Sequence, residues 1–456
     1  MKKKLFGTDG IRGIAGEYPL NDDTIKKIAY AASGILSKNY NDKSTKRVII
    51  GGDTRSSRGH IFDALCSGFM SGGFTIHNAG VAPTPAISFL VKQLGCICGV
   101  VISASHNTWE YNGIKFFSGS GEKLPDNLEY EIEQEFYKTS DIPNVDDEYR
   151  LGFDHTNTGP IKASEEYKKF LLSTVPKEFN LKGMKVVIDC ANGALYKIAP
   201  NFFQELGADV IAINCKPNGK NINADCGSLH KEDIMRSVRE NNADLGFAFD
   251  GDGDRVLFTD EKGSDLDGDH LMAIAAVSLK EQGRLKNNTL IITIMTNLGL
   301  KLAMNDMGIK TIETGVGDRY VYEAMKTNDL NLGGEQSGHI IFRDYSVTGD
   351  GMLTALQILR IVKEKGKRLS ELGGIIKKLP QILINVKVRE KKDIMAIPKL
   401  KERYNTIKNS LGSEGRINVR YSGTEPLLRV MIEGRNKEEI EDMAGGYAEL
   451  IKKELE

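Results

Sequence analysis

The chain repeats one local pattern three times, and this pattern constrains the fold more than any other feature of the sequence. In each copy an apolar, β-branched run ends in a small or polar turn, a helical segment follows, and a glycine opens a second apolar run. The copies span residues 47–80, 185–214 and 289–317. Strands that alternate with helices of this length form βαβ units with a largely parallel sheet. We therefore expect three α/β domains of related architecture.

Polar segments mark the expected domain boundaries. The 456 residues are enough for three or four domains. The expected boundaries fall near 140–150, near 260–269 and within 366–381. The first of these holds a proline and an acid-rich stretch. Beyond the third boundary the order changes to strand, helix, strand, strand and helix, an α+β pattern. The predicted domains, arranged around a central cleft, are residues 1–150, 151–258 and 259–370 (α/β, with mixed or parallel sheets) and 371–456 (α+β).

Composition excludes several classes of protein. The net charge of −1 gives no reason to expect binding to nucleic acid or to an anionic membrane. The N-terminal lysines are not followed by the apolar segment of a signal peptide, and apolar runs such as 271–279 are too short to span a bilayer. The six cysteines form no C-x-x-C pair, and Cys96 and Cys98 read as small core residues. We expect a cytoplasmic protein.

Residues Phe247–Asp260, FAFDGDGDRVLFTD, place three carboxylates in one turn between two short apolar runs. Alternate residues of an extended or tightly turning backbone project to the same side, so Asp250, Asp252 and Asp254 should converge. A hard divalent cation, most plausibly Mg²⁺, would remove their mutual repulsion. Arg255 adds a guanidinium suited to phosphate. An EF-hand calcium loop fits less well, because its sixth position requires glycine; a solvated acidic turn is the other alternative.

A serine-containing loop follows an apolar strand in CGVVISASHNTWEYNGIKFF, residues 98–117. Ser103 and Ser105 lie beyond the expected C-terminal end of that strand, a usual position for reactive groups in α/β sheets. The pair Asn112–Gly113 predicts a tight turn before the next strand. No nucleophile elbow is present, and no Asp/His pair can be assigned to His106. A polar loop with hydrogen-bonded serines is an equal alternative on this segment alone.

Two later segments carry groups suited to a phosphorylated sugar. Glu335 and Ser337 stand between glycines, where a carboxylate and a hydroxyl could bind adjacent sugar hydroxyls; a helix-capping turn is the alternative. In residues 417–430 a turn combines guanidinium, hydroxyl and backbone N–H donors, which favours a phosphate site over a plain hairpin turn. The candidate phosphate-binding residues are Arg420, Ser422, Gly423, Thr424 and Arg429.

Taken in order, these segments resemble the α-D-phosphohexomutase superfamily. The resemblance runs from Phe6 to about Gly434 and rests on FGTDGIRG, ISASHN with NGIKFF, DCANGA, FDGDGDR, GGEQSGH and SGTEPLLRVMIEG. Each motif is modest evidence alone, whereas the ordered set is highly specific. NINADCGS, TNLGL, GVGDRYV and the glutamine of GEQSG favour the branch that acts on glucosamine phosphate.

The resemblance implies an activity and a role for each matching residue. The activity is the interconversion of glucosamine 6-phosphate and glucosamine 1-phosphate through a phosphoserine and a 1,6-bisphosphate, with hexose 1,6-bisphosphate as activator. The implied catalytic residues are Ser105, Lys115, Arg12 and Arg255. The implied ligands of Mg²⁺ are Asp250, Asp252, Asp254 and an oxygen of phosphorylated Ser105. The implied substrate-binding residues are Glu335, Ser337, Arg420, Ser422, Gly423, Thr424 and Arg429.

Two departures from the family pattern accompany this resemblance. Thr108 and Tyr421 stand where the family usually has proline, and losing a fixed φ should loosen each loop without deleting a reacting group. The alternatives are a phosphoglucomutase/phosphomannomutase of the same superfamily, a metal-dependent phosphatase, and a non-catalytic phosphosugar-binding protein. Relatives of this kind suggest a homodimer, but no stretch of the sequence demonstrates an interface.

Overall fold

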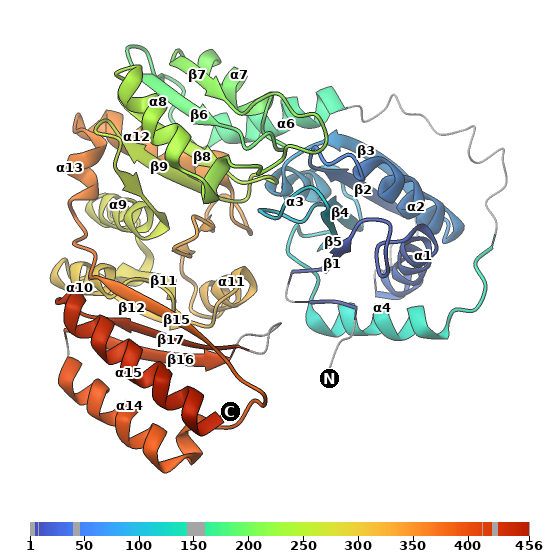
Figure 1. The fold of residues 1–456 in the computed structure, drawn as a ribbon. Coiled ribbons are helices and arrows are strands. Elements are labelled where there is room, and N and C mark those ends of the chain that lie inside the picture. The colour runs from blue at the N-terminus through green and yellow to red at the C-terminus, as the bar shows by residue number, and fades with distance from the viewer. Residues whose placement is uncertain are drawn as a thin grey trace. The chain divides into compact units, whose positions relative to one another are not determined.

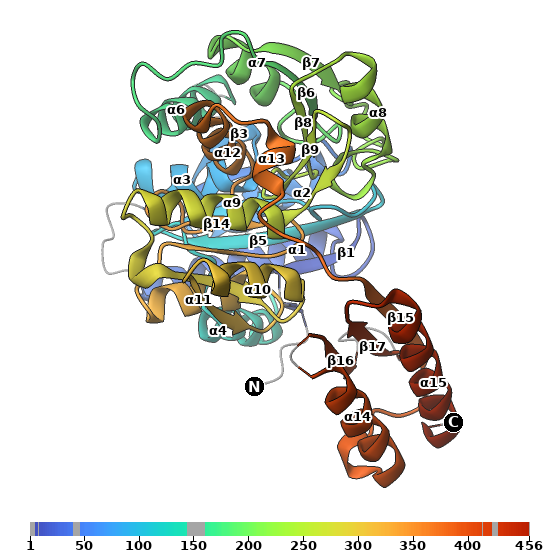
Figure 2. The same cartoon turned by 90° about the vertical axis from the view of Figure 1, so that its left-hand side faces the viewer.

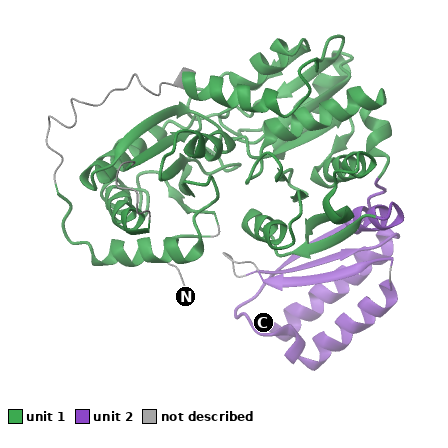
Figure 3. Ribbon diagram, turned by 180° about the vertical axis from the view of Figure 1, so that it is seen from behind, with its two compact units in different colours: residues 1–295, 309–375 green, residues 296–308, 376–456 purple. Residues whose placement is uncertain are grey.

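The residues that the structure describes form four β-sheets with their helices, whose elements are drawn in Figures 1 and 2. This computed structural model describes residues 5–7, 9–39, 46–143, 160–412, 414–421 and 427–455. Its contacts divide the chain into two compact units, coloured in Figure 3. The first unit comprises Met1–Met295 and Ile309–Ile375, and the second comprises Thr296–Gly308 and Ile376–Glu456. The four domain boundaries expected from the sequence stay predictions.

The first sheet is five-stranded and mixed, in the order β1-β5-β4-β2-β3. Strand β2 pairs in parallel with both β3 and β4, whereas β5 runs antiparallel to β4 and to β1. Its elements are β1 (Ile11–Ile14), α1 (Asp22–Asn39), β2 (Arg47–Gly52), α2 (Arg58–Ser71), β3 (Thr75–Val81), α3 (Thr84–Gln93), β4 (Cys98–Ile102), β5 (Tyr111–Ser118) and α4 (Asp126–Lys138).

Both faces of this sheet are covered, which explains why its central strands are apolar throughout. Val48 and Ile50 of β2 belong to one core cluster with residues of α1, α2 and α4. Ile49, between them, belongs to a second cluster with residues of α3. Side chains alternate between the faces of a strand, so a strand buried on both sides has no polar face.

The second sheet has the order β10-β9-β8-β6-β7, with β6 parallel to β7 and β8, and β9 antiparallel to β8. Its elements are α6 (Pro160–Ser173), β6 (Lys185–Asp189), α7 (Ile198–Glu205), β7 (Asp209–Ile213), η2 (Gly227–Leu229), α8 (Glu232–Glu240), β8 (Leu245–Phe249), β9 (Val256–Asp260) and β10 (Asp265–Leu266). The acidic turn joins β8 to β9, so the two apolar runs that flank it are both strands.

The third sheet has the order β12-β11-β13-β14. The pair β11–β12 is parallel, as β2–β3 and β6–β7 are, so all three repeats form the predicted βαβ units. The elements are α9 (Gly268–Glu281), η3 (Lys286–Asn288), β11 (Thr289–Thr293), β12 (Lys310–Thr314), α11 (Asp318–Thr327), β13 (Leu332–Gly334), β14 (Ile340–Phe342), α12 (Gly351–Lys365) and α13 (Leu369–Gly373).

The second unit contains an antiparallel sheet in the order β15-β17-β16. Its elements are α10 (Leu298–Asp306), β15 (Gln381–Lys387), η4 (Ile394–Ala396), α14 (Pro398–Leu411), β16 (Arg416–Tyr421), β17 (Leu427–Glu433) and α15 (Lys437–Leu455). This is the α+β order predicted from the sequence, and the α/β class of the rest is likewise confirmed. Among the described residues, no helix combines the length and the apolarity that crossing a bilayer requires.

One local prediction was wrong. Asn112 and Gly113 do not form a tight turn but lie inside β5, where Gly113 pairs with Arg12 of β1. The glycine has a steric reason, because a Cβ there would meet the carbonyl oxygen of Ser103 at 2.6 Å. Its partner Arg12 is likewise a strand residue.

Candidate active site

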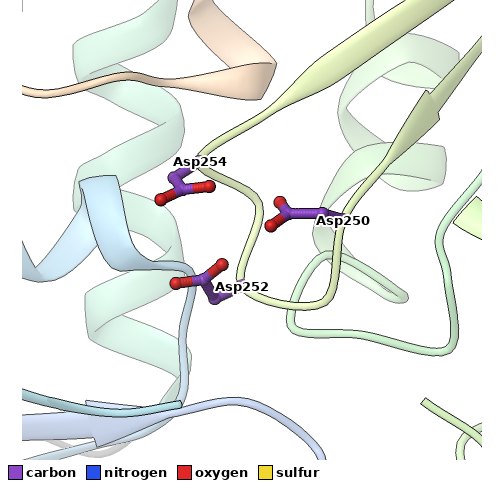
Figure 4. Close-up of side chains that lie close together, drawn as sticks. All are labelled: Asp250, Asp252 and Asp254. Carbon is purple, nitrogen blue, oxygen red and sulfur yellow. The ribbon is translucent and has the colours of Figure 1, made fainter. Parts of the chain in front are cut away.

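Asp250, Asp252 and Asp254 converge in the β8–β9 turn, as Figure 4 shows. One carboxylate oxygen from each lies within 4.8 Å of the others, and all three residues are buried. The Oδ1 atoms of Asp252 and Asp254 are buried without a hydrogen-bond partner. Buried carboxylate oxygens without partners are costly, and a divalent cation is the ligand that satisfies them.

The three carboxylates differ in their surroundings. Burial, followed by the charges of Asp254 and Asp252, raises the pKa of Asp250 well above its ordinary value. Burial would also raise the pKa of Asp254, but Lys115 and His339 outweigh it and leave the pKa below the ordinary value. A cluster in which one carboxyl resists ionisation stores repulsion that a cation would relieve.

Lys115 of β5 provides the main countercharge within this cluster. Its Nζ lies 2.9 Å from Asp252 Oδ2 and 3.8 Å from Asp254 Oδ2, and only 2% of its side chain is exposed. Burial would lower the pKa of Lys115, but Asp252 and Asp9 raise it above the ordinary value, so the amine is charged in this arrangement. Thr84 Oγ1 donates to the same Asp252 oxygen at 2.6 Å.

Ser105 lies directly beside the acidic cluster. Its Oγ donates a 2.6 Å hydrogen bond to Asp250 Oδ2, and its backbone φ is +54°, in the left-handed region. The backbone N–H of Ser105 donates to Ser103 Oγ at 2.9 Å. The turn and the serine loop approach closely enough that a Cβ on Gly251 would meet Ser105 O at 2.7 Å. The structure thus brings together a serine and a triad that are about 145 residues apart in sequence.

Two side chains hold the serine loop in this strained conformation. Arg55 Nη2 donates to the carbonyl oxygens of Ser105 at 3.2 Å and of Asn107 at 2.5 Å. Asn223 Nδ2, from the second sheet's connections, donates to the same two oxygens at 2.9 Å each. Arg55 is itself fixed by a fully buried ion pair with Asp53. Strained backbone persists where surrounding contacts over-determine it, and it gathers at functional sites.

Arg12 and Arg255 flank the serine loop. Arg12 Nη1 donates to Ala104 O at 3.3 Å, and the backbone N–H of Arg255 donates to Asp250 Oδ1 at 3.2 Å. Both guanidinium charges act on His106: burial, followed by the charges of Arg255 and Arg12, lowers its pKa to about 4. The imidazole is therefore neutral, and the positive charge around Ser105 comes from arginine and lysine.

Glu335 and Ser337 lie in the turn between β13 and β14. Glu335 Oε1 accepts from the backbone N–H of Gly317 at 2.9 Å, and Ser337 Oγ donates to Glu335 Oε2 at 3.4 Å. Both side chains are partly exposed. Glu335 also lies near enough to Arg255 for its charge to raise the pKa of the guanidinium.

Arg420 and Arg429 are register partners on β16 and β17 of the second unit. Burial, and then the charge of Arg429, lowers the pKa of Arg420. Like charges opposite one another on a sheet destabilise it, so this pair is suited to an anion. Ser422, Gly423 and Thr424 lie outside the described residues. Tyr421, in place of the family's proline, donates through its hydroxyl to Lys392 O at 2.6 Å.

Several residues around this site did not stand out in the sequence. Asp9, Arg55 and Asn223 each contact a candidate residue or its loop, and Lys123 joins Asp9 to Asp318. Asp9, Asn223 and Asp318 lie in motifs that carry the family resemblance, whereas Arg55 and Lys123 lie in none of them. No motif indicated which residue any of the five would contact. Their contacts join segments that are far apart along the chain, which local patterns do not report.

Four domain descriptions match the chain in order. Residues 3–142 match "Phosphoglucomutase/phosphomannomutase, alpha/beta/alpha domain I", residues 165–263 match domain II, residues 267–379 match domain III, and residues 383–450 match the C-terminal domain.

Two curated relatives are similar over their whole length. A phosphoglucosamine mutase of Syntrophotalea carbinolica is 46% identical over 457 residues, covering 100% of this chain and 98% of the relative. A phosphoglucosamine mutase of Geobacter metallireducens is 49% identical over 459 residues, covering 99% of each. The chain belongs to the phosphoglucosamine mutase family. As a member of this family of phosphohexomutases it is an enzyme, an isomerase.

Solved structures show that this phosphoglucosamine mutase family member has the phosphohexomutase fold. A phosphoglucomutase/phosphomannomutase family protein of Burkholderia thailandensis superimposes with a TM-score of 0.79 at 20% identity, covering 98% of this chain and 97% of the other. N-acetylphosphoglucosamine mutase of Aspergillus fumigatus, in complex with GlcNAc-6P and magnesium, gives a TM-score of 0.67 at 18% identity, covering 99% and 96%. A variant of that enzyme in complex with glucose 1,6-bisphosphate gives 0.63 at 17%, with the same coverage.

Proposed function

We propose that the protein interconverts glucosamine 6-phosphate and glucosamine 1-phosphate, with Ser105 as the residue that carries the phosphoryl group. The observation that carries this proposal is the position of the Ser105 hydroxyl, 2.6 Å from Asp250 and beside a buried acidic cluster balanced by Lys115. The choice of an amino sugar is supported by full-length identity of 46–49% to phosphoglucosamine mutases.

We further propose that Asp250, Asp252, Asp254 and phosphorylated Ser105 hold Mg²⁺. The residues fit the ion, because oxygen is the ligand that Mg²⁺ prefers and two of the carboxylate oxygens are buried without a partner. When bound, the ion would neutralise charge that develops on the transferring phosphoryl group. The A. fumigatus enzyme in complex with magnesium supports this choice of metal.

The protein's own side chains would supply the remaining positive charge, the acid/base groups and the positioning of the serine loop. Phosphoryl transfer depends mainly on positioning and charge stabilisation, because its transition state makes few covalent demands on the protein. Lys115, Arg12 and Arg255 would surround the phosphoryl group with fixed positive charge and supply the acid/base groups that the sugar hydroxyl requires. Arg55 and Asn223 would hold the serine loop in place by its carbonyl oxygens.

The sugar and its second phosphate require separate contacts. Glu335 and Ser337 would bind sugar hydroxyls, and Arg420, Arg429 and residues 422–424 would bind the phosphate that is not reacting. The phosphoryl group would pass from Ser105 to the free hydroxyl of the substrate, forming a 1,6-bisphosphate. After this intermediate reorients, its other phosphate would return to Ser105. A hexose 1,6-bisphosphate would therefore act as activator by phosphorylating Ser105.

The expected setting is the cytoplasm, supported by six unpaired cysteines, five of them buried.

The experiment that tests the function measures kcat/KM for glucosamine 6-phosphate, glucose 1-phosphate and mannose 1-phosphate, with Mg²⁺ and glucose 1,6-bisphosphate present. A preference of about tenfold or more for the amino sugar, about 1.4 kcal/mol in the transition state, supports the proposal. Equal or better use of glucose or mannose phosphate would indicate a general hexose mutase, and no turnover would indicate a phosphosugar-binding protein.

A further inference from the structure

The Asp9 carboxylate contacts three cations at once. Its Oδ2 faces Lys115 Nζ at 3.2 Å and forms an ion pair with Arg12 Nη2, while its Oδ1 forms an ion pair with Lys123 Nζ. Lys115 and Arg12 are two of the three groups proposed to surround the transferring phosphoryl group, the third being Arg255. One carboxylate therefore contacts both of them.

Lys123 extends this chain of charges to α11. Its Nζ forms a second ion pair with Asp318, the first residue of α11. A carboxylate is favoured there because the N-terminus of a helix carries partial positive charge. The side chains of Lys123 and Asp318 are 14% and 16% exposed, so these pairs are only weakly screened by solvent. Contacts of alternating charge thus run from Asp252 through Lys115, Asp9 and Lys123 to Asp318.

The turn that ends this chain also contacts the sugar-binding loop. Gly317, immediately before Asp318, donates its backbone N–H to Glu335 Oε1 at 2.9 Å. Two adjacent residues therefore hold Glu335 on one side and Lys123 on the other. A shift of Glu335 on binding sugar hydroxyls would act on the same short turn as the ion pair.

We propose that Asp9, Lys123 and Asp318 form an ion-pair relay that positions Lys115 and Arg12 for phosphoryl transfer and couples them to the loop that carries Glu335. This inference rests on the proposed function. A lysine ammonium is a point charge on a flexible stem, so its placement depends on the groups that surround it. A misplacement of about 1 Å can cost on the order of 100-fold in rate, so fixed surroundings have a direct catalytic value.

The simpler alternative is that these ion pairs only stabilise the packing of α11 against the elements of the first sheet. Other pairs already stabilise that packing: Arg319 contacts Glu129 at 3.0 Å, and Tyr322 and Lys326 contact Glu122 at 2.7 and 3.0 Å. None of these pairs touches Lys115 or Arg12 in the structure. Lys326→Gln therefore removes an ion pair from the same helix without touching the relay, and it is the matched control.

The first experiment compares three variants of the full chain. Lys123→Met, which keeps most of the length of the side chain and removes its charge, should lower kcat about 10- to 100-fold while KM changes by less than about threefold. Lys123→Arg should recover at least a third of the lost activity, because it restores the charge. Lys326→Gln should match the wild type. A merely structural loss would instead lower the melting temperature and the active fraction, and the arginine substitution would not selectively restore kcat.

The second experiment asks whether Lys123 acts through Lys115. In a Lys115→Met background, Lys123→Met should lower kcat by a clearly smaller factor than in the wild-type background, because one of the two groups that it positions is already gone. An equal loss of activity in both backgrounds, or unchanged kcat in the single Lys123→Met variant, would overturn the relay.

A readout that does not depend on the identity of the hexose separates the relay from the proposed function. Phosphorylation of Ser105 by glucose 1,6-bisphosphate, followed by intact mass, should be slower in Lys123→Met than in Lys326→Gln. A wild type that is phosphorylated while Lys123→Met reacts at the same rate would refute the relay alone. A wild type that neither turns over a hexose phosphate nor becomes phosphorylated would refute the proposed function and the relay with it.

Discussion

At the scale of single residues, Ser105 combines a strained backbone with a specific partner. Its φ of +54° is uncommon for a residue with a Cβ, and the loop is held there by Arg55 and Asn223. Because those contacts go to carbonyl oxygens, the side chain itself contributes little to holding the loop. The hydroxyl is thus available for chemistry, and its removal should be tolerated by the fold.

We predict that Ser105→Ala lowers kcat by at least about 1,000-fold and leaves the melting temperature within a few degrees of the wild type. The large loss is expected because the phosphoryl carrier is removed and no other described hydroxyl donates to Asp250. Steady-state turnover and intact mass after incubation with glucose 1,6-bisphosphate check it. Ser120→Ala, an exposed serine of the same domain, is the control. Full activity of Ser105→Ala would refute the phosphoserine assignment.

Asp250, the partner of Ser105, is buried among like charges, and this burial disfavours its ionised form. We predict that Asp250→Asn raises the melting temperature of the metal-free protein, because it removes one of three clustered carboxylates. The same change should abolish the increase in melting temperature that Mg²⁺ gives the wild type. Thermal unfolding in EDTA and in millimolar Mg²⁺ measures both effects. A variant that keeps the wild-type Mg²⁺ shift would contradict the assignment of Asp250 as a ligand.

At the scale of secondary-structure elements, the start of α12 supports the acidic turn. The backbone N–H of Gly351 donates to Gly253 O at 3.0 Å, so this helix begins against the turn itself. Asp350 caps the helix, accepting from Leu353 N at 2.9 Å, and the hydroxyl of Tyr167 on α6 donates to the same oxygen at 2.7 Å. One buried carboxyl therefore joins two helices at the edge of the site.

This junction predicts a dependence of stability on pH. Burial raises the pKa of Asp350 from 3.8 to about 6. Between these values the folded state keeps a proton that the unfolded chain has lost, so the stability contributed by the protonated form is complete below pH 3.8 and is lost as the pH rises through about 6. The full effect is about 3 kcal/mol at most.

The variant that tests this junction is Asp350→Asn, which keeps the cap and the acceptor for Tyr167 but does not ionise. Its melting temperature should fall less than that of the wild type between pH 4.5 and pH 7.5. Tyr167→Phe should instead lower stability at pH 7.5 by about 1–3 kcal/mol, because it removes a donor from a buried carboxylate. Parallel pH profiles for the wild type and Asp350→Asn would show that another group controls this range.

How far the sequence predicts such elements depends on whether the information is local. The three βαβ units and the β8–β9 turn followed from the alternation of apolar runs, turns and glycines, all within about 30 residues. The turn predicted at Asn112–Gly113 was wrong because a glycine required for close approach to Ser103 looks the same in sequence as a turn glycine. The pairing of Lys123 with Asp9 and Asp318 could not be predicted, since it joins residues separated by 114 and 195 positions.

At the scale of the whole molecule, the candidate residues are divided between the two compact units. Ser105, Lys115 and the acidic triad belong to the first unit, and Arg420 and Arg429 belong to the second. Among the described residues, the hydrogen bonds and ion pairs of Ser105, Asp250, Asp252 and Asp254 are made within the first unit. Metal binding and binding of the substrate's distal phosphate should therefore be separable by mutation.

We predict that Arg420→Ala and Arg429→Ala each raise KM for glucosamine 6-phosphate by about 10- to 100-fold, because each removes a charged donor to phosphate. The Mg²⁺-induced shift in melting temperature should be unchanged. Stability without ligand should stay the same or rise, since each substitution relieves the repulsion between two arginines in register. Arg435→Ala, which removes an exposed arginine of the same unit paired with Glu414, is the control and should leave KM unchanged. A lost Mg²⁺ shift would mean that the two units are coupled in metal binding, and an unchanged KM in both variants would remove these arginines from the phosphate site.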